Sequence, residues 1–363
     1  MRSERKSKAK PLLIFLAKSG IAAILLYLLL RNTRYEDFAR NLRGISWWWL
    51  AAAASLHLIG YLVSAYRWRI LLVAQGLQPS LWELIKSYVI ATFFNYVLLG
   101  TVGGDISRAY DTGVRSRKGA EAVSAVFLER VTGVAAMMFL AALGILFLLL
   151  GPTRLSISAF WNVQAAVGTC VGMFLLLFAI LFVLFHPRIV QMIAGKLDRP
   201  NPFFGKLRKI FLSLHTAISV YRSDLTPIYR NLFWALVLQV NVTVHYFFIG
   251  LAMGLPLLSH ALHYFCSYMV IVPAVTLILM IPITPGGAGV REWTLRELRS
   301  GLGFDPTAAS SVARSVLMGW LQLATVLLYG SIGFVMFLYR LFLARRLKRE
   351  TVVTTRTANT PMP

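Results

Sequence analysis

Long, uninterrupted apolar runs constrain the fold of this chain more than any other feature. Crossing the hydrocarbon core of a bilayer takes ~20 residues, and runs of about that length recur along the chain. In lipid, a helix pairs all its backbone polar groups within one segment. Six stretches are predicted to be full spans: residues 12–30, 47–66, 123–150, 161–185, 232–251 and 308–337. The predicted fold class is therefore an all-α polytopic membrane protein.

The composition agrees with a single membrane domain and no sizeable soluble domain. Of the 363 residues, 58% are hydrophobic and only 14% are charged, whereas a soluble domain averages about a quarter charged residues. We divide the chain into an N-terminus (1–10), one transmembrane domain (11–340) and a tail (341–363). The Thr- and Pro-containing segment 351–363 is predicted to be disordered.

The basic residues indicate how the spans are oriented. The chain carries 37 Lys and Arg against 14 Asp and Glu, a formal net charge of +23. Because these residues flank apolar spans, the positive-inside rule explains them better than nucleic-acid binding does. Both termini and the region 186–230 are therefore predicted to be cytoplasmic, in a multi-pass protein of the cell (inner) membrane. The loop 31–46 disagrees, because it holds four arginines yet is predicted to lie outside.

Two glycine-rich, charge-bearing breaks, residues 100–108 and 282–292, interrupt apolar sequence. They follow the apolar stretches 81–99 and 262–283. Broken backbone and ionised side chains are tolerated at membrane depth only where protein or a water-filled cavity covers them. Many transporters build their substrate site from two broken helices in this way. The two breaks are therefore the strongest indication of function.

Charge placement predicts that each broken stretch is a re-entrant helical hairpin, the first entering from the cytoplasm and the second from outside. The halves 11–150 and 161–340 would then form an inverted repeat around a midplane site. Between them, the amphipathic segment 187–230 could lie flat on the cytoplasmic face. A packed helical hairpin is the alternative interpretation of the same segment.

The first break contains Gly103, Gly104, Asp105 and Arg108. The two charged residues are three apart, so they share one face of a helix that starts after the glycines. Asp105 could simply cap that helix, with Arg108 as a surface partner. The other interpretation is a substrate site in which both side chains face a polar cavity.

A second pair of charges, Glu129 and Arg130, lies within an apolar span. Adjacent helical residues point about 100° apart, so these two side chains need separate partners inside the bundle. Burying either charge costs a few kcal/mol, which makes an accidental location improbable. The alternative is that both side chains reach the cytoplasmic interface.

The second break contains Gly286, Gly287, Gly289, Arg291 and Glu292. Successive glycines can form a nest of backbone N–H groups that favours anions, and Arg291 could bind phosphate through two hydrogen bonds. Glu292 would then orient Arg291 or carry a proton. The alternative is a tight turn between half-helices that a charge pair locks.

The remaining polar residues are weaker signals. Arg67 is predicted to be an interfacial anchor beside an aromatic residue. Asn241 and His245 share a helix face and are expected to act as interhelical contacts. Cys170 and Cys266 fit the role of small buried hydrophobes. No catalytic array, metal-ligand spacing or nucleotide fingerprint is evident, so we predict no catalytic residues, no metal and no cofactor.

Three motifs, taken in order, resemble one membrane family. They are Gly-Gly-Asp-x-x-Arg at 103–108, Leu-Glu-Arg at 128–130 and Pro-Gly-Gly-x-Gly-x-Arg-Glu at 285–292. Together they are similar to the flippase-like transmembrane domain of lysylphosphatidylglycerol synthases. The resemblance covers roughly residues 10–340. It implies movement of a phospholipid between leaflets, and relatives are implicated with polyprenyl-linked sugars. The chain ends soon after the last span, so we expect a stand-alone membrane domain without the synthase domain.

Three functional hypotheses follow. The first is a translocase for a phosphate-bearing or anionic lipid or a polyprenyl-linked head group, and not an enzyme. Arg108, Arg130 and Arg291 would engage phosphate, while Asp105, Glu129 and Glu292 would orient them or relay protons. The second is a non-catalytic membrane partner of a lipid-modifying enzyme or glycosyltransferase. The third is a membrane-embedded enzyme acting on a lipid head group, against which the absence of an evident nucleophile–base pair argues.

Overall fold

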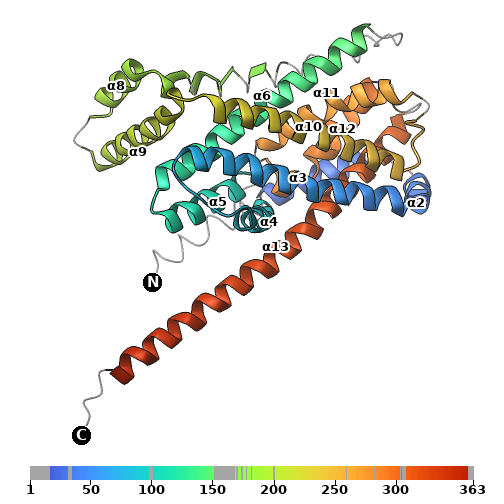
Figure 1. The fold of residues 1–363 in the computed structure, drawn as a ribbon. Coiled ribbons are helices and arrows are strands. Elements are labelled where there is room, and N and C mark those ends of the chain that lie inside the picture. Colours follow the sequence, from blue (N-terminus) through green and yellow to red (C-terminus); the bar gives the residue numbers. More distant parts are fainter. Residues whose placement is uncertain are drawn as a thin grey trace.

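All secondary structure in the described part of the chain is helical (Figure 1). The computed structural model describes residues 17–31, 35–97, 101–150, 186–198, 201–258, 260–281, 283–302, 304 and 308–358, with scattered residues of 168–185. A short apolar helix, Ala17–Leu30, comes first. The elements that follow are α2 (Tyr35–Arg43), α3 (Trp47–Ala74), α4 (Leu81–Val97), α5 (Thr101–Ser116), α6 (Gly119–Leu150), α8 (Pro187–Lys196), α9 (Pro202–Ser219), η1 (Val220–Arg222), α10 (Thr226–Ala252), α11 (Ala261–Met280), η2 (Pro285–Gly287), α12 (Val290–Gly301) and α13 (Ala308–Ala358).

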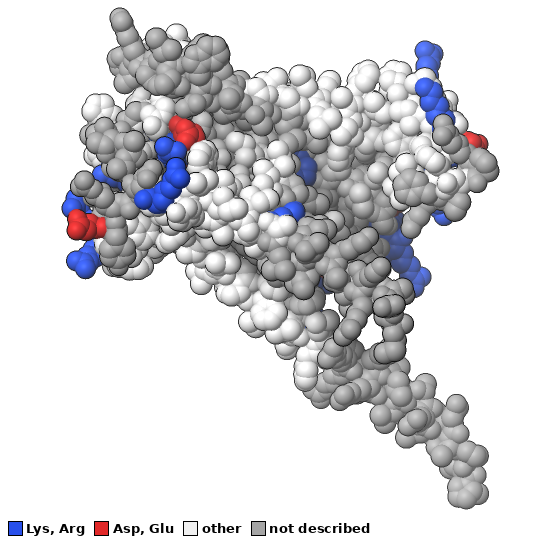
Figure 2. All heavy atoms as spheres, turned by 180° about the vertical axis from the view of Figure 1, so that it is seen from behind, with Lys and Arg blue, Asp and Glu red and all other residues white. Residues whose placement is uncertain are grey.

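The predicted all-α membrane fold is confirmed. Within the described residues, five helices are long and apolar enough to cross a membrane: α3, α6, α10, α11 and α13. Lys and Arg gather towards two opposite ends of the face in Figure 2, with a broad, largely uncharged surface between them. Most of the predicted span 161–185 lies outside the described residues. One difference from expectation is α11, which has the length of a full span although the sequence predicts it to be one arm of a re-entrant hairpin.

The core is built on α3 and α10, which pack side by side and run antiparallel. The amide of Ser46, before α3, donates to the carbonyl of Ala252 at the end of α10 over 2.8 Å. Both helices end on a glycine in the left-handed conformation, Gly76 with φ +71° and Gly254 with φ +69°. The next amide in each case donates to the carbonyl five residues earlier, Leu77 over 3.0 Å and Leu255 over 3.1 Å. These are matching Schellman-type helix ends.

The helices that follow α3 and α10 pack in a matching pattern. α4 lies against α13, and α11 lies against α6. Glycine makes both contacts close: a Cβ at Gly333 of α13 would collide with the Val89 carbonyl of α4. A Cβ at Gly144 of α6 would lie 2.8 Å from the Cys266 carbonyl oxygen of α11. The buried position predicted for Cys266 is confirmed, whereas Cys170 lies outside the described residues.

The two broken stretches open towards opposite ends of the bundle. α4 and α5 pack together, and Glu83 at the start of α4 lies 3.9 Å from Arg115 at the end of α5. At the other end of the molecule, the rings of Tyr264 on α11 and Phe304 after α12 are 5.0 Å apart. The inner tips also meet, since α4 contacts η2.

Three expectations need correction or resolution. The first break does not separate the glycines from the helix, because α5 begins at Thr101 and includes Gly103 and Gly104. The segment 187–230 forms the helical hairpin α8–α9, and α9 packs against α6. The tail predicted to be disordered from residue 351 continues as helix to Ala358. The sequence of α13 contains no proline, so nothing of that kind interrupts the helix in its Thr-rich part.

Candidate functional site

A chain of buried ion pairs joins α5 to α6. Arg108 donates through Nη1 to Glu129 Oε2 over 3.0 Å and through Nη2 to Asp105 Oδ1 over 2.6 Å. The other oxygen of Asp105 accepts a 2.6 Å hydrogen bond from Arg130 Nε. Tyr88 of α4 donates its hydroxyl to Glu129 Oε1. Two arginines and two carboxylates thus form one continuous, formally neutral network.

Helix geometry explains how the sequence builds this network. Asp105 and Arg108 share a face of α5, three residues apart. Glu129 and Arg130 diverge around α6, and each has its own partner on α5, as the sequence predicts. The interfacial alternative does not hold for Glu129, which is only 7% exposed.

Gly104 allows α5 to approach α4 closely. Its amide donates to Asn95 Oδ1 over 2.7 Å, and a Cβ there would lie 2.6 Å from the Ala91 carbonyl oxygen. Asp105 lies one turn inside the helix and bonds two arginines, so the N-cap alternative for Asp105 does not hold. The glycines shorten the distance between two helices and do not break one.

Arg67 extends the network further into the core. It is 3% exposed, and its Nη2 lies 3.1 Å from the Glu129 carbonyl oxygen and 3.2 Å from both Thr132 Oγ1 and Asn231 Oδ1. Asn231 returns a 2.7 Å hydrogen bond to the Arg67 carbonyl. The predicted interfacial anchor is therefore wrong. The sequence offers one signal, the lone Asn231 near the start of α10, which the prediction did not use.

The second break is a compact turn. Gly286, Gly287 and Gly289 all have positive φ, at 59°, 75° and 82°. Arg291 is buried and donates through Nη2 to the Gly286 carbonyl over 2.9 Å. Glu292 is buried too, and it accepts the Gly289 amide through Oε2 over 2.6 Å.

The amides expected to form an anion nest have acceptors inside the turn. Gly287 N donates to the Thr284 carbonyl and Ala288 N to the Pro285 carbonyl, each over 3.2 Å. Gly289 N is bonded to Glu292. The geometry therefore favours the locked-turn interpretation of this motif over the phosphate nest.

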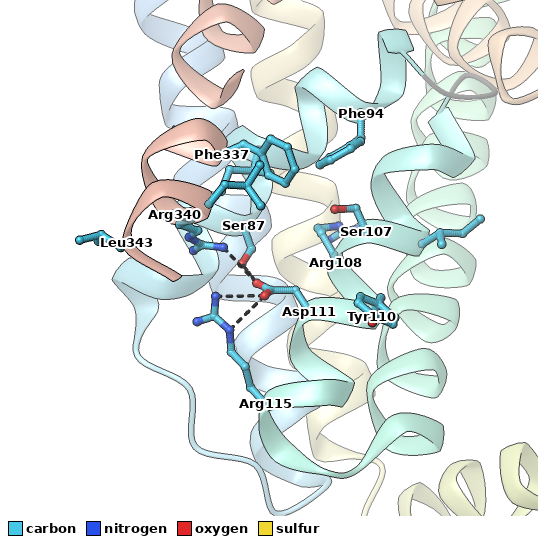
Figure 3. A pocket seen from close by; sticks show the side chains of 13 residues that line it. Ser87, Phe94, Ser107, Arg108, Tyr110, Asp111, Arg115, Phe337, Arg340 and Leu343 are labelled. Atoms are coloured by element: carbon cyan, nitrogen blue, oxygen red, sulfur yellow. Dashed lines mark hydrogen bonds and ion pairs between the residues drawn. The ribbon is translucent and has the colours of Figure 1, made fainter. Parts of the chain in front are cut away.

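An open groove lies beside the ion-pair network, between α4, α5 and α13. It encloses about 740 Å³. Its polar side chains include Arg108, Asp111, Arg115 and Arg340, and its apolar ones include Ile90, Phe94, Phe337 and Leu341. Figure 3 shows Arg115 and Arg340 converging on Asp111 from two helices. Arg115 Nε lies 3.0 Å from Asp111 Oδ1, and Arg340 Nη1 lies 3.2 Å from Oδ2.

A second groove of about 1030 Å³ lies on the other side of α5, against α6 and α9. Its walls are mostly apolar, and Asp105 and Arg130 form part of its lining with Lys209 of α9. α5 thus stands between two grooves. Asp105 links them, because it bonds Arg108 of the first groove and Arg130 of the second.

Comparison with known proteins places the chain in a family. A family model described as the lysylphosphatidylglycerol synthase TM region matches residues 15–330. The chain belongs to this family. Neither the curated proteins nor the solved structures give a match. Membership of the lysylphosphatidylglycerol synthase TM-region family confirms the resemblance seen in the three motifs and gives this multi-pass membrane protein a lipid-related function.

Among the described residues, no group of three or more His, Cys, Asp or Glu could hold a metal ion. What the site offers is charge and hydrogen bonding. Buried arginines between carboxylates can exchange one anionic partner for another, and the adjoining grooves provide apolar surface. These are the properties needed to hold an amphiphile with a negatively charged head group.

Proposed function

We propose that this protein translocates a phosphate-bearing or anionic lipid across the membrane. The observation that carries the proposal is the first groove, in which basic side chains and apolar side chains line one open cavity. Family membership supplies the lipid-related setting. The groove supplies a place where a head group and its tails could be held together.

The charge balance of the groove favours an anion. The charge of Arg108 is balanced within the buried network, and the rest of the lining includes Arg115 and Arg340 against the single carboxylate of Asp111, which is two positive charges to one negative. Arg115 and Arg340 share that carboxylate. A phosphate placed between them would give each guanidinium a further acceptor, in the planar two-bond geometry that arginine prefers.

The apolar lining suits the remainder of a lipid. Phe94 and Phe337 pack edge to face with ring centroids 5.1 Å apart, and Ile90 and Leu341 line the same cavity. An open groove of this kind would let acyl or prenyl chains stay in the bilayer while the head group lies against the arginines. About 740 Å³ lies within the range of small-molecule sites.

Arg108 connects the groove to the buried network. A phosphate that reached Arg108 would compete with Glu129 and Asp105 for the same guanidinium. Competition with Glu129 would loosen α5 from α6, because the Arg108–Glu129 pair joins the two helices. We propose that this exchange of partners couples lipid binding to movement of the first hairpin.

We further propose that the two halves are an inverted repeat, with α4–α5 and α11–α12 as its two hairpins. The matching contacts of α4 with α13 and of α11 with α6 support this proposal. So do the glycine ends of α3 and α10 and the opposite openings of the hairpins. Alternating access in such proteins commonly moves one repeat against the other around a fixed site.

Reconstitution tests the function directly. Vesicles of phosphatidylcholine with a trace of fluorescent phosphatidylglycerol, with and without the protein, should show faster exchange of the label between leaflets when it is present. Arg115→Gln with Arg340→Gln should slow exchange at least tenfold, while Arg188→Gln, an exposed change on α8, should not. Conversion of the head group would identify an enzyme. No exchange with several anionic lipids would favour the partner-protein alternative.

A further inference from the structure

A second polar cluster lies in the core, where α3, α4, α10 and α13 meet, and the ion-pair network does not include it. His57 of α3 and His245 of α10 have ring centroids 5.4 Å apart. Tyr329 of α13 stacks on His57 at 5.4 Å with an interplanar angle of 16°. Tyr61, one helical turn after His57, packs edge to face against both the His57 and Tyr329 rings. The cluster therefore joins both halves of the molecule.

A chain of hydroxyl groups runs from His57 towards the ion-pair network. His57 Nε2 lies 3.2 Å from the Tyr61 hydroxyl, which lies 3.0 Å from Thr92 Oγ1. Thr92 Oγ1 is in turn 3.0 Å from the carbonyl oxygen of Tyr88, whose side chain bonds Glu129. The hydrogen-bond chain thus ends on the backbone of Tyr88, the residue whose side-chain hydroxyl bonds the carboxylate that holds Arg108.

Each hydroxyl in this chain can both donate and accept, so the chain has two polarities. When His57 Nε2 carries a proton, Nε2 donates to Tyr61, Tyr61 donates to Thr92, and Thr92 donates to the Tyr88 carbonyl. When Nε2 is bare, it accepts from Tyr61, and Tyr61 accepts from Thr92. Protonation of Nε2 therefore changes whether the Thr92 hydroxyl donates to Tyr61 of α3 or to the Tyr88 carbonyl of its own helix.

The surroundings of His245 can also accommodate both its neutral and its protonated form. Its Nδ1 lies 2.7 Å from the Ala53 carbonyl oxygen, an acceptor, so Nδ1 carries the hydrogen. Among the described residues, its buried Nε2 has no hydrogen-bond partner within normal geometry, yet the Gln322 side chain of α13 interacts with this ring. A terminal amide can turn its nitrogen to a bare Nε2 or its oxygen to a protonated one.

We propose that the His57–His245 pair binds one transported proton and couples its movement to that of the anionic lipid. Like charges this close oppose each other, so the pair takes up a single proton. Among the described residues, no Asp, Glu, Lys or Arg is hydrogen-bonded to either ring. The described groups that face the pair include Tyr61 of α3, Thr92 of α4, Tyr246 of α10, and Gln322 and Tyr329 of α13.

None of these facing groups is a carboxylate, so the positive charge of a bound proton is not balanced locally. An anionic lipid that moves with the proton would balance it. A proton on this pair adds one uncompensated positive charge to a buried site, which is costly. A lipid phosphate in the interior brings a negative charge with the same cost. Moving both together lowers the cost of each. The proposal rests on the proposed lipid translocation, and it adds the coupling ion and its binding site.

The test uses the same fluorescent phosphatidylglycerol vesicles with a pH difference of one unit across the membrane. One proton per singly charged lipid should enrich the label about tenfold on the alkaline side, because one pH unit corresponds to a factor of ten. His57→Gln and His245→Gln should each exchange the label but leave it evenly distributed. Tyr61→Phe, which keeps both rings and interrupts the hydroxyl chain, should reduce the enrichment. His186→Gln, an exposed change before α8, should behave as the original protein.

The outcomes separate this inference from the function on which it rests. Fast exchange with an even distribution in the original protein overturns proton coupling and leaves translocation intact. Complete absence of exchange overturns translocation. In that case ¹⁵N spectra of histidine-labelled protein, assigned with the two variants, decide the proton site. Uptake of one proton shared between the two rings supports it, and two rings that stay neutral until the protein unfolds overturn it.

Discussion

The two hairpins carry the same short pattern and fold it in different ways. Gly-Gly-x-x-x-Arg occurs at 103–108 and again at 286–291. In the first, both glycines are helical, and Arg108 reaches two carboxylates beside an open groove. In the second, the glycines have positive φ, and Arg291 donates to the carbonyl of Gly286 in its own turn.

Neighbouring residues determine whether the glycines form a turn or a close contact between helices. Pro285 precedes the second pair and begins a short 3₁₀ turn that includes both glycines. Their backbone is left-handed, a conformation that only glycine adopts readily without strain. In the first pair, the missing Cβ is used to bring Gly104 against Ala91 of α4. One hairpin thus holds a network of side-chain ion pairs, and the other holds a backbone turn. We expect the first to determine binding and the second to determine stability.

The largest effect should come from breaking the buried network in the first hairpin. Glu129→Gln removes one of the two carboxylates that Arg108 bonds, so the buried network of two arginines and two carboxylates is left with one excess positive charge. An uncompensated buried charge costs ~3–5 kcal/mol. Thermal unfolding in detergent should show a clear loss of stability, and lipid exchange should fall with it.

Glu83→Gln is the matched control, since it removes a carboxylate from the same hairpin. Its pair with Arg115 is 3.9 Å long and about half exposed, and exposed pairs contribute little. Its melting temperature should therefore stay close to the original. Equal losses in the two variants would mean that the network is not energetically distinct from surface pairs.

A second effect should follow from filling the close contact between α4 and α5. Gly104→Ala places a methyl group 2.6 Å from the Ala91 carbonyl oxygen, and overpacking of this kind costs ~1–3 kcal/mol. Gly119→Ala, at the start of α6, meets nothing within 4 Å and should be neutral. Unfolding midpoints of the two variants give the comparison. An unaffected Gly104→Ala would show that the helices separate easily.

The sequence predicted the parts of this structure that depend on local pattern. Apolar run length identified the long helices, and helical periodicity required separate partners for Glu129 and Arg130. The sequence-based prediction failed where the environment of a residue depends on packing between segments far apart in the chain. Arg67 was taken for an anchor, because nothing local shows that Asn231 of α10 lies beside it.

The His57–His245 pair illustrates the same limit. Its members are 188 residues apart in sequence, and only the antiparallel packing of α3 on α10 brings the rings together. His245 was recognised as an interhelical contact, but His57 gave no signal of its own. The glycine motifs also show that one pattern permits two backbone conformations, and the sequence prediction assigned a break to both.

A smaller effect is expected from Arg291→Lys in the second hairpin. Lysine keeps the charge but replaces the planar guanidinium that bonds the Gly286 carbonyl. Loss of that bond should cost about 1 kcal/mol of stability. Lipid exchange per folded molecule should stay within about twofold of the original. Strong loss of exchange in a well-folded protein would instead restore the phosphate-binding interpretation of this motif.

The smallest effect should be a gain, at the opening of the first groove. Asp111 competes with any bound anion, because it bonds both Arg115 and Arg340. Its carboxylate is 32% exposed and Arg115 is 46% exposed, so each pair is worth only ~0.2–1 kcal/mol. Asp111→Asn should therefore tighten binding of fluorescent phosphatidylglycerol by roughly two- to fivefold, with the gain shrinking as salt is raised. Asp198→Asn, on the exposed pair of Asp198 with Arg208 near α9, should leave binding unchanged. Weaker binding by Asp111→Asn would mean that the carboxylate orders the two arginines for the lipid and does not compete with it.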